Sequence, residues 1–378
     1  MERSSLAHLR FPAEQGRGRR YPEPPHFYRN EFQRDRDRIV HSRAFRRLED
    51  KTQVFPPGLS DHFRNRLTHT IEVAQIARTV ASVLELEESL TEALALVHDI
   101  GHPPFAHAGE EELDRQMKMH ADSFDHNLHA LRIVEQFEQR YARFPGLNLT
   151  FEVREGIVKH SREVGAGERG PLAEFLPGLR PPLEAQLIDL GDEIAYNTAD
   201  LDDAFEAGLF TMDEMCEHVP PYSVILEEIE FQFPGASERL KFHESIRRAI
   251  DALVSGLING TYDSATEARV DSSQAVREHP ERLARFTASS QEMGRLLKRF
   301  LHRRVYDSDT LVRERDQSAR KIASLFQFYL ADPGRLPDGR QEALQTEPPH
   351  RVVCDYIAGM TERYFEKSYR RAFGDSER

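Results

Sequence analysis

Apolar residues recur every three or four positions through most of the chain, which is the spacing of helices with one buried face. In residues 66–86 these positions are Leu67, Ile71, Ala74, Ala77 and Leu84. Comparable runs cover residues 89–100, 124–144, 151–160, 182–208, 239–258, 291–306 and 321–330. Strand signals are confined to short pieces such as KTQVF. The pattern therefore predicts an all-α protein.

Glycine and proline separate these runs. Pro103 and Pro104 break the chain after the run that ends near residue 100, and Gly208 is suited to terminate the long helix over residues 182–208. Residues 161–182 are dense in both residue types, which predicts a long loop.

Composition narrows the class of protein. Of the 378 residues, 39% are hydrophobic and 30% are charged, which is typical of a folded protein with a polar surface. The most apolar stretch, residues 90–97, is too short to span a membrane, and the N-terminus lacks the apolar core of a signal peptide, so we expect a cytoplasmic protein. Two cysteines, Cys216 and Cys354, exclude a disulfide scaffold or a cysteine-rich zinc module. Any metal must therefore be bound by carboxylates and by some of the 17 histidines.

Charge is distributed unevenly. The formal net charge is −13, which argues against a protein that binds nucleic acid over its whole surface. Residues 1–50, however, hold 12 arginines against 8 carboxylates. This arm either contacts an anionic partner, such as a phosphate ligand, nucleic acid or a neighbouring subunit, or pairs its charges internally, as the alternation in residues 33–38 indicates.

A cluster of polar residues follows the helix that ends near residue 97. The segment HDIGHPPFAHAGEE places His98, Asp99, His102, His107 and Glu110 within a few residues of one another. A single His-Asp pair is most often a surface or capping feature. The whole cluster is harder to explain by packing alone, because it would be electrostatically unfavourable without a cation or an anionic ligand.

Two residues on other predicted helices can complete a metal site. His69 and Asp192, together with His98 and Asp99, would form a set of two imidazoles and two carboxylates in a helical core. Such a set suits divalent cations of intermediate softness.

Several motifs, taken in order, resemble one family. They are SRAFRRLEDKTQVF, RLTHTIEV, HDIGHPPFAHAGEEELD, FDHNLHALRIVEQF, DLGDEIAYNTADLDDA, FLHRRVYD and RVVCDYIAGMTERYFEKSYRRAF. The set resembles the HD-domain superfamily, specifically its deoxyguanosine-triphosphate triphosphohydrolase-like branch, over most of residues 29–370. The resemblance implies an HD-domain helical bundle with additional C-terminal helices. On this basis we expect an arginine-rich arm and first helix in residues 1–50, a phosphohydrolase core in 51–210 and a helical C-terminal region in 211–378.

The same resemblance implies a hydrolase that converts a dNTP to deoxynucleoside and inorganic triphosphate. One divalent cation would be required, with Mn²⁺ or Mg²⁺ expected first and Fe²⁺, Ni²⁺, Co²⁺ or Zn²⁺ as alternatives. The residues matching the family's metal ligands are His69, His98, Asp99 and Asp192. His107 matches the histidine that protonates the leaving oxygen, and Glu110 would orient it. His102 and His126 match positions that face the phosphates, although His126 could also be a simple neighbour of a helix cap.

Substrate-binding residues follow from the same motifs. Asp192, Tyr196 and Asp200 are spaced four residues apart, so they lie along one face of a helix. By resemblance, Tyr196 closes against the deoxyribose, and Asp200 and Gln53 bind the 3′-hydroxyl; the alternative for Tyr196 is a core residue. Further nucleotide contacts match Arg66, Lys298 and Tyr306, with a solvated helix arginine as the alternative for Arg66. Some relatives have a phosphate-binding lysine where this chain has Glu193, so we expect Glu193 to point away from the phosphates.

Two other functions are compatible with the same residues. One is an HD-type nucleotidase or phosphodiesterase that acts on another nucleotide. The other is a nucleotide- or nucleic-acid-binding regulator with little turnover. By resemblance we also expect a homo-oligomer, a hexamer by analogy, with a second, allosteric dNTP and single-stranded DNA as further partners and no membrane association.

Overall fold

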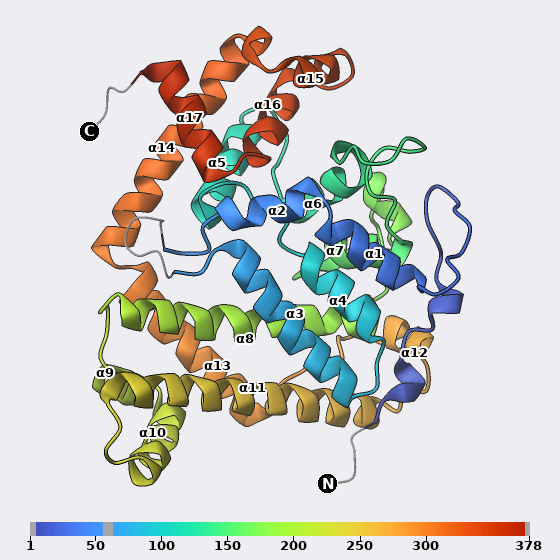
Figure 1. Ribbon diagram of the computed structural model, residues 1–378. Helices are drawn as coiled ribbons and strands as arrows, with labels where there is room; N and C mark the ends of the chain where they lie inside the picture. Colours follow the sequence, from blue (N-terminus) through green and yellow to red (C-terminus); the bar gives the residue numbers. More distant parts are fainter. Residues whose placement is uncertain (1–4, 56–62, 375–378) are drawn as a thin grey trace. The chain divides into compact units, whose positions relative to one another are not determined.

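The structure is a computed structural model that describes residues 5–55 and 63–374. Throughout these residues every regular element is a helix, and β contacts are limited to isolated bridges (Figure 1). The predicted all-α class is therefore confirmed. None of the described helices combines the length and the apolar character needed to cross a membrane.

The chain forms two compact units, which we call unit 1 and unit 2 and describe separately. Unit 1 comprises Met1–Asp37, His69–Leu96 and Leu149–Ser308. Unit 2 comprises Arg38–Thr68, Val97–Asn148 and Asp309–Arg378. Each unit is assembled from three separate stretches of the sequence. The expected division into residues 1–50, 51–210 and 211–378 concerns continuous segments and stays a prediction.

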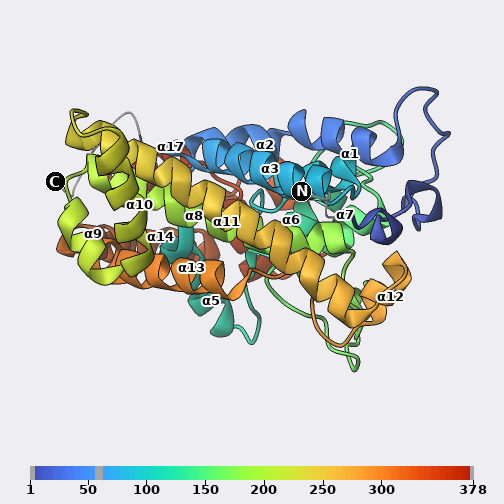
Figure 2. The same cartoon turned by 90° about the horizontal axis from the view of Figure 1, so that it is seen from below.

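Most of the helices belong to unit 1. They are α1 (Glu31–Val40) and α3 (Arg66–Val83), each with three residues in unit 2, α4 (Glu88–Val97), with its last residue in unit 2, and α7 (Phe151–Lys159), α8 (Leu183–Glu206), α9 (Met212–His218), α10 (Pro220–Gln232), α11 (Glu238–Ala268), α12 (Ser273–Glu278) and α13 (Ala288–Leu301). The long helices α8, α11 and α13 pack against one another, as Figure 2 shows. Gly208, with φ +68°, follows the end of α8 as predicted.

The buried face of α3 differs from the predicted one. Ile71, assigned to the apolar stripe, is 54% exposed, whereas Val73, Ala77 and Val80 are fully buried. A methyl group added at Gly191 of α8 would lie 3.6 Å from the Cβ of Ala77, so small residues let the two helices pack closely. The buried face of α3 includes this contact with α8 and continues toward the start of the helix through buried polar residues. Hydrophobic spacing does not predict that part of the face, because it considers only apolar positions.

The arginine-rich arm pairs much of its charge internally. Arg19 is buried and forms ion pairs with Glu31 and Asp35. Arg34 also contacts Glu31, and two further arginines of the arm, Arg29 and Arg36, pair with Asp37. The interpretation of the arm as a segment with internal ion pairs is confirmed for these residues.

Unit 2 is built around helices from distant parts of the sequence. They are α2 (Arg43–Arg47), α5 (Ala106–Lys118), α6 (His126–Arg132), α14 (Asp309–Ala331), α15 (Asp338–Gln341), α16 (Pro349–Ala358) and α17 (Glu362–Phe373). α14 packs against α5, α16 and α17. The hydrophobic core of unit 2 includes Leu113 of α5 together with Phe326, Val353 and Phe365 of the C-terminal helices. The C-terminal helices therefore support α5.

α6 ends earlier than the sequence pattern predicted. The apolar run continues to residue 144, but α6 gives way to a wider helical turn over Ile133–Phe137, and the chain then leaves the helix. The carboxylate of Glu138 accepts the backbone N–H groups of Arg43 and Ala44, at 3.1 and 2.7 Å. Glu138 is thereby hydrogen-bonded to the start of α2 in place of continuing the helix. This contact between distant residues cannot be predicted from the local apolar spacing.

Candidate functional site

The first turn of α3 carries two predicted site residues on its buried side. Arg66 begins the helix, and its backbone N–H donates to the carbonyl of Lys51 at 3.0 Å. Within unit 2, Arg66 Nη1 donates to Asp99 Oδ2 at 2.7 Å. Within unit 1, His69 Nε2 lies 2.9 Å from Asp192 Oδ1. Because Arg66 is only 2% exposed, the alternative of a solvated helix arginine is wrong.

The loop after α4 depends on two glycines. A Cβ at Gly101 would lie 2.0 Å from the carbonyl oxygen of His126 and 2.6 Å from the nitrogen of Ala130. A Cβ at Gly109 would lie 2.0 Å from the carbonyl oxygen of Pro104. Neither position tolerates a side chain, because the groups met are backbone atoms. The glycines therefore allow the loop, α5 and α6 to approach closely.

Asp99 is the electrostatic centre of the unit 2 site. It is buried and lies near His102 Nδ1 at 3.0 Å, His98 Nε2 at 3.4 Å and the Arg66 guanidinium. Burial alone would raise the pKa of Asp99, but the nearby His102, His98 and Arg66 hold that pKa well below its ordinary value. Asp99 is thus a carboxylate at neutral pH. The same burial, together with Arg66, keeps the pKa of His102 well below its usual range.

Three imidazoles and one carboxylate lie beside Asp99. The rings of His102 and His126 are stacked with centroids 4.0 Å apart, and the His102 and His107 rings meet edge to face at 6.2 Å. Glu110 Oε1 lies 2.7 Å from His126 Nδ1 and accepts the His126 backbone N–H at 3.0 Å. Asp125 is the N-cap of α6, so His126 neighbours the cap and also faces Glu110.

Glu110 is thus hydrogen-bonded to His126, whereas the sequence paired it with His107. Burial would raise the pKa of Glu110, but the hydrogen bond and charge of His126 lower it to about 2. His107 is exposed, and its pKa is lowered by partial burial and by the charge of Arg66. His107 is therefore a neutral, exposed imidazole, and the hydrogen-bonded pair of Glu110 and His126 lies on the same side of unit 2.

Unit 1 presents a row of side chains along α8. Asp192, Tyr196 and Asp200 follow one another at four-residue spacing, as expected from the sequence. The Tyr306 hydroxyl donates to Asp200 Oδ2, and Lys298 Nζ lies 5.7 Å from the centre of the Tyr196 ring. The Tyr196 hydroxyl is buried and meets no hydrogen-bonding partner in the described part of the chain. A core tyrosine would normally satisfy this hydroxyl, so its position favours the functional interpretation of Tyr196.

Glu193 lies beside Asp192 and close to the charge of Lys298. Burial, together with the negative charge of Asp192, raises the pKa of Glu193, while Lys298 acts in the opposite direction. A Cβ at Gly294 of α13 would lie 3.3 Å from Glu193 Oε1, so the side chain is directed at α13.

The surroundings of one predicted residue, Gln53, are only partly defined, and the structure shows two buried residues that the sequence analysis missed. The Oε1 atom of Gln53 is buried and accepts no hydrogen bond from any described residue, which fits a ligand contact. Sequence reasoning missed Lys51 and Glu362, both buried in unit 2 and hydrogen-bonded to the segment between His102 and α5. The only signal available for them was their place within the motifs KTQVF and RVVCDYIAGMTERYF.

Two family models match separate segments of the chain. Residues 66–197 match the HD domain, and residues 284–371 match the phosphohydrolase-associated domain. The first segment runs from Arg66 to just beyond Tyr196. The second includes α14, α16 and α17, which support α5 in unit 2.

Curated relatives resemble the chain over nearly its whole length. A deoxyguanosinetriphosphate triphosphohydrolase-like protein of Ralstonia nicotianae is 47% identical, covering 96% of this chain and 92% of the relative. Proteins of the same description from an Azoarcus species and from Geobacter sulfurreducens are 46% and 42% identical, covering 96% and 100% of this chain and 94% and 97% of the relatives. This degree of similarity shows that the chain belongs to the deoxyguanosinetriphosphate triphosphohydrolase-like family of HD-domain phosphohydrolases.

Proposed function

We propose that the protein is a metal-dependent dNTP triphosphohydrolase that cleaves a dNTP to deoxynucleoside and inorganic triphosphate. The observation that carries this proposal is the grouping in unit 2 of Asp99 with Arg66 and the imidazoles of His98, His102 and His126. A buried carboxylate among cationic and imidazole groups is suited to the chemistry of a phosphate ester.

By family likeness, four side chains are proposed to hold one divalent cation: His69, His98, Asp99 and Asp192. The donor set fits, because two imidazoles and two carboxylates suit Mn²⁺, Fe²⁺, Ni²⁺, Co²⁺ or Zn²⁺, and carboxylates alone favour Mg²⁺. The lowered pKa of Asp99 keeps this donor ionised at neutral pH. When bound, such a cation polarises a phosphate oxygen and lowers the pKa of a bound water. Mn²⁺ and Mg²⁺ are the first metals to test.

The remaining polar residues of unit 2 are proposed to handle the triphosphate and the leaving oxygen. Arg66 is a fixed cation next to Asp99 and would stabilise phosphate charge. His102 and His126 would donate to phosphate oxygens. Loss of the nucleoside 5′-oxygen requires a proton, and we assign its delivery to His107, whose imidazole would first have to be protonated beside the bound triphosphate. Glu110 would hold His126 next to it through their hydrogen bond.

Unit 1 is proposed to bind the nucleoside. Asp200, held by the Tyr306 hydroxyl, would accept the 3′-hydroxyl, and Gln53 from unit 2 would provide a second contact. Tyr196 would pack against the sugar, where a closely placed ring leaves no room for a 2′-hydroxyl. Lys298 lies over Tyr196 and would contribute positive charge.

Product analysis tests the proposal. The purified protein is incubated with each of the four dNTPs, singly and mixed, with Mn²⁺ or Mg²⁺, and the products are resolved by ion-exchange chromatography. Intact triphosphate and deoxynucleoside in equal amounts are expected. Orthophosphate or pyrophosphate would instead identify a different nucleotidase, and absence of any product with every metal would favour a binding protein.

Assembly and regulation are proposed by family likeness. We propose a homo-oligomer, with a hexamer as the first model, and a second dNTP that changes the rate. Single-stranded DNA is a further proposed partner. Sedimentation velocity with and without dNTP tests the assembly, and addition of oligonucleotides to the activity assay tests the DNA effect.

A further inference from the structure

Two buried charged residues of unit 2, Lys51 and Glu362, have no role in the proposed function but hydrogen-bond to the backbone of segments that carry the proposed catalytic groups. Lys51 is 3% exposed, and its Nζ donates to the carbonyl oxygen of His102 and, at 3.4 Å, to that of Ala358 at the end of α16. Its own carbonyl accepts the Arg66 N–H. Lys51 therefore ties the His102 backbone to α16 and to the start of α3.

Glu362, the first residue of α17, holds the other end of the same segment. It is 7% exposed. Its Oε1 accepts the backbone N–H groups of Thr52 and Phe105, at 2.9 and 3.0 Å, and its Oε2 accepts the Thr52 hydroxyl at 2.5 Å. One carboxylate thus joins the residue after Lys51 to the residue that precedes α5.

The segment held in this way is strained. Phe105 and Ala106 have φ values of +64° and +51°, and two consecutive non-glycine residues in the left-handed region are uncommon. His107 follows directly, and Glu110 lies one turn later. Such a turn persists only where its surroundings fix it, and the hydrogen bond from Phe105 N–H to Glu362 provides a fixed point.

We propose that Glu362, assisted by Lys51, is a positioning residue that sets the direction of His102, His107 and Glu110 by fixing the backbone from His102 to Phe105. This inference rests on the proposed function for its effect on catalysis, but the positioning itself is independent of the substrate. It also gives the phosphohydrolase-associated segment a specific task, because Glu362 lies within residues 284–371.

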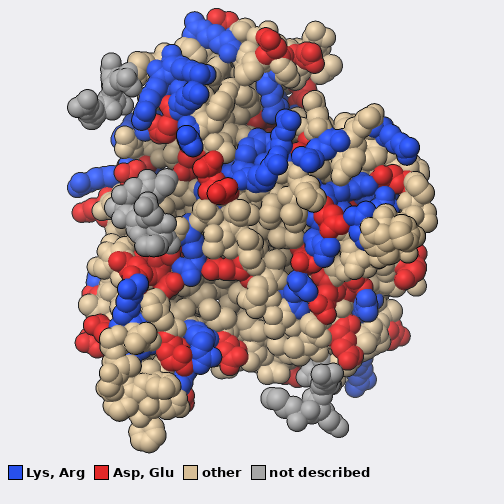
Figure 3. Space-filling model, in the orientation of Figure 1, with Lys and Arg blue, Asp and Glu red and all other residues tan. Residues whose placement is uncertain are grey.

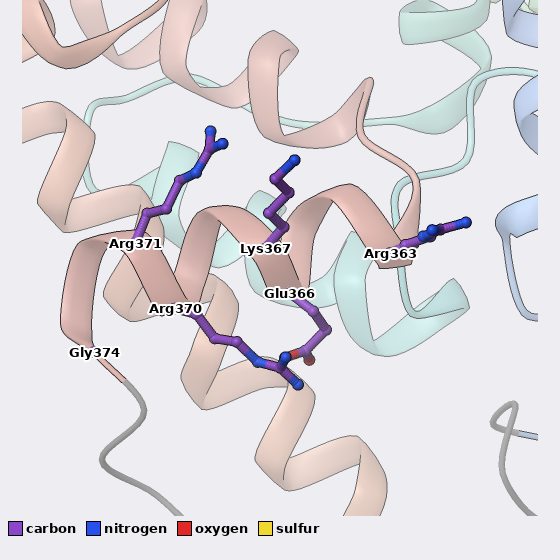
Figure 4. Close-up of a pocket in the computed structure, with 6 residues that line it drawn as sticks. All are labelled: Arg363, Glu366, Lys367, Arg370, Arg371 and Gly374. Atoms are coloured by element: carbon purple, nitrogen blue, oxygen red, sulfur yellow. The ribbon is translucent and has the colours of Figure 1, made fainter.

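The same helix offers a matched control. Glu366, one turn after Glu362, forms an ion pair with Lys321 at 2.8 Å and contacts none of the residues from His102 to Phe105 in any described interaction. Figure 4 shows Glu366 and Arg370 projecting from one side of α17 and Lys367 and Arg371 from the other, and Figure 3 shows basic side chains gathered over this helix. Substitutions at Glu366 therefore test the helix without testing the loop.

Two conservative substitutions at Glu362 separate the effect of side-chain length from the effect of charge. Glu362→Gln keeps the length of the side chain, so its amide oxygen can accept both N–H groups and its NH₂ can donate to the Thr52 hydroxyl. Glu362→Asp keeps the charge but shortens the side chain by one methylene, which withdraws the carboxylate from Phe105. Positioning by hydrogen bonds predicts an active Gln variant and an impaired Asp variant, whereas a role of the charge alone predicts the reverse.

The experiment measures kcat and KM of the full chain together with backbone amide exchange of peptides covering residues 99–112. For Glu362→Asp we expect kcat to fall by about tenfold to a hundredfold with KM little changed, since small displacements of catalytic groups have effects of this size. The peptides should exchange faster. Glu362→Gln and the matched controls Glu366→Gln and Glu366→Asp should stay within about threefold of the wild type, well short of the loss that a displaced catalytic group causes.

Unchanged exchange in Glu362→Asp would overturn the positioning role, whatever the substrate is. Faster exchange with unchanged kcat would overturn the link to catalysis. If the wild-type protein releases no triphosphate, the proposed function fails, but the exchange data still decide whether Glu362 holds the loop. Should Glu362→Asp fold poorly, Thr52→Val removes one of the three hydrogen bonds, and a rate of exchange equal to the wild type would then count against the proposal.

Discussion

Unit 1 presents three of its candidate residues along one regular helix, whereas unit 2 collects most of its own from a loop and from the starts of three helices. In unit 1, α8 alone fixes the spacing of Asp192, Tyr196 and Asp200. In unit 2, Asp99 and His102 depend on glycines, a strained turn and buried hydrogen bonds. A site on a regular helix needs few supporting residues, while a site on a loop needs many. Substitutions should therefore affect stability and activity differently in the two units.

The largest effect is expected from removing one proposed metal ligand in each unit. Asp99→Asn and Asp192→Asn should each lower kcat/KM by roughly 10³-fold, because each removes a charged donor from the proposed cation site. Stability should separate the two. Asp99→Asn leaves the buried Arg66 without its carboxylate and should cost about 3 kcal/mol or more, whereas the Asp192 side chain is 24% exposed and its loss should cost much less.

Product release and urea unfolding measure these two quantities. Asp122→Asn serves as the control, since this partly exposed aspartate pairs with Arg351 on the outside of unit 2. Equal losses of stability at Asp99 and Asp192 would contradict the distinction between the two units. Activity above about a tenth of wild type in either variant would contradict the ligand assignment, given the loss expected when such a group is removed.

Two glycines sharpen the comparison. Gly101→Ala should destabilise the protein by about 2–4 kcal/mol, because its Cβ would collide with backbone atoms of α6. Gly191→Ala in α8 should be neutral or stabilising by up to about 1 kcal/mol, because the added methyl makes ordinary contact with Ala77 and alanine favours helices. Thermal unfolding measures both, and Gly165→Ala, where nothing lies within 4 Å, is the neutral control. A stable Gly101→Ala protein would show that the loop can move away from α6.

The sequence predicted the helical part of the site better than the loop. The four-residue spacing of Asp192, Tyr196 and Asp200 is a local property of a helix, so it could be read directly. The pairing of Glu110 could not, because its partner His126 lies 16 residues away and offers both a ring nitrogen and a backbone N–H at the start of α6. The family resemblance and the short distance in sequence favoured His107 as its partner, because neither takes account of contacts between distant parts of the chain.

The fold shows the same limit. The all-α class and the long helix α8 follow from local periodicity. The buried face of α3 was assigned partly wrongly, since Ile71 is exposed while Arg66 and His69 are buried. Polar residues of the candidate site occupy the face that hydrophobic spacing assigns to apolar residues, and the apolar Ile71 lies outside that face. The support from Lys51 and Glu362 involves residues about 310 positions apart, which no local pattern can indicate.

Acid should act on unit 2 through Glu110. Its folded pKa of about 2 lies below the ordinary value of 4.5, so the stability it contributes is present above pH 4.5 and is lost as the pH falls toward 2. The contribution is at most about 3 kcal/mol, from the size of the shift. His102 and His107, whose pKa values are lowered, make the folded state less stable already as the pH falls below 6.5. Unfolding free energies of the wild type and Glu110→Gln from pH 7 to 3 separate these effects.

The Gln variant should show a weaker dependence of stability on pH below 4.5, where Asp99 and His129, whose pKa values are also lowered, still contribute, and should keep the part between 6.5 and 4.5. Glu111→Gln, the neighbouring exposed residue on α5, should leave both parts unchanged. Identical curves for Glu110→Gln and the wild type below pH 4.5 would show that the contact with His126 contributes no stability.

The smallest effect is expected at the hydrogen-bonded pair of Tyr306 and Asp200, the last residue of the row along α8. Burial and the charge of Asp200 raise the pKa of Tyr306, so its hydroxyl stays protonated and donates to Asp200. Tyr306→Phe removes this donor without changing the ring, and kcat/KM for a dNTP should fall by about tenfold, the usual value of one hydrogen bond to a charged group. The loss should appear mainly in KM, because Asp200 is proposed to bind the sugar and to take no part in bond cleavage. Tyr262→Phe on α11 is the control, since no described residue bonds its hydroxyl. A fall in kcat at constant KM would show that this end of α8 acts on the reacting phosphate, and the division between a sugar-binding helix and a phosphate-binding loop would then have to be abandoned.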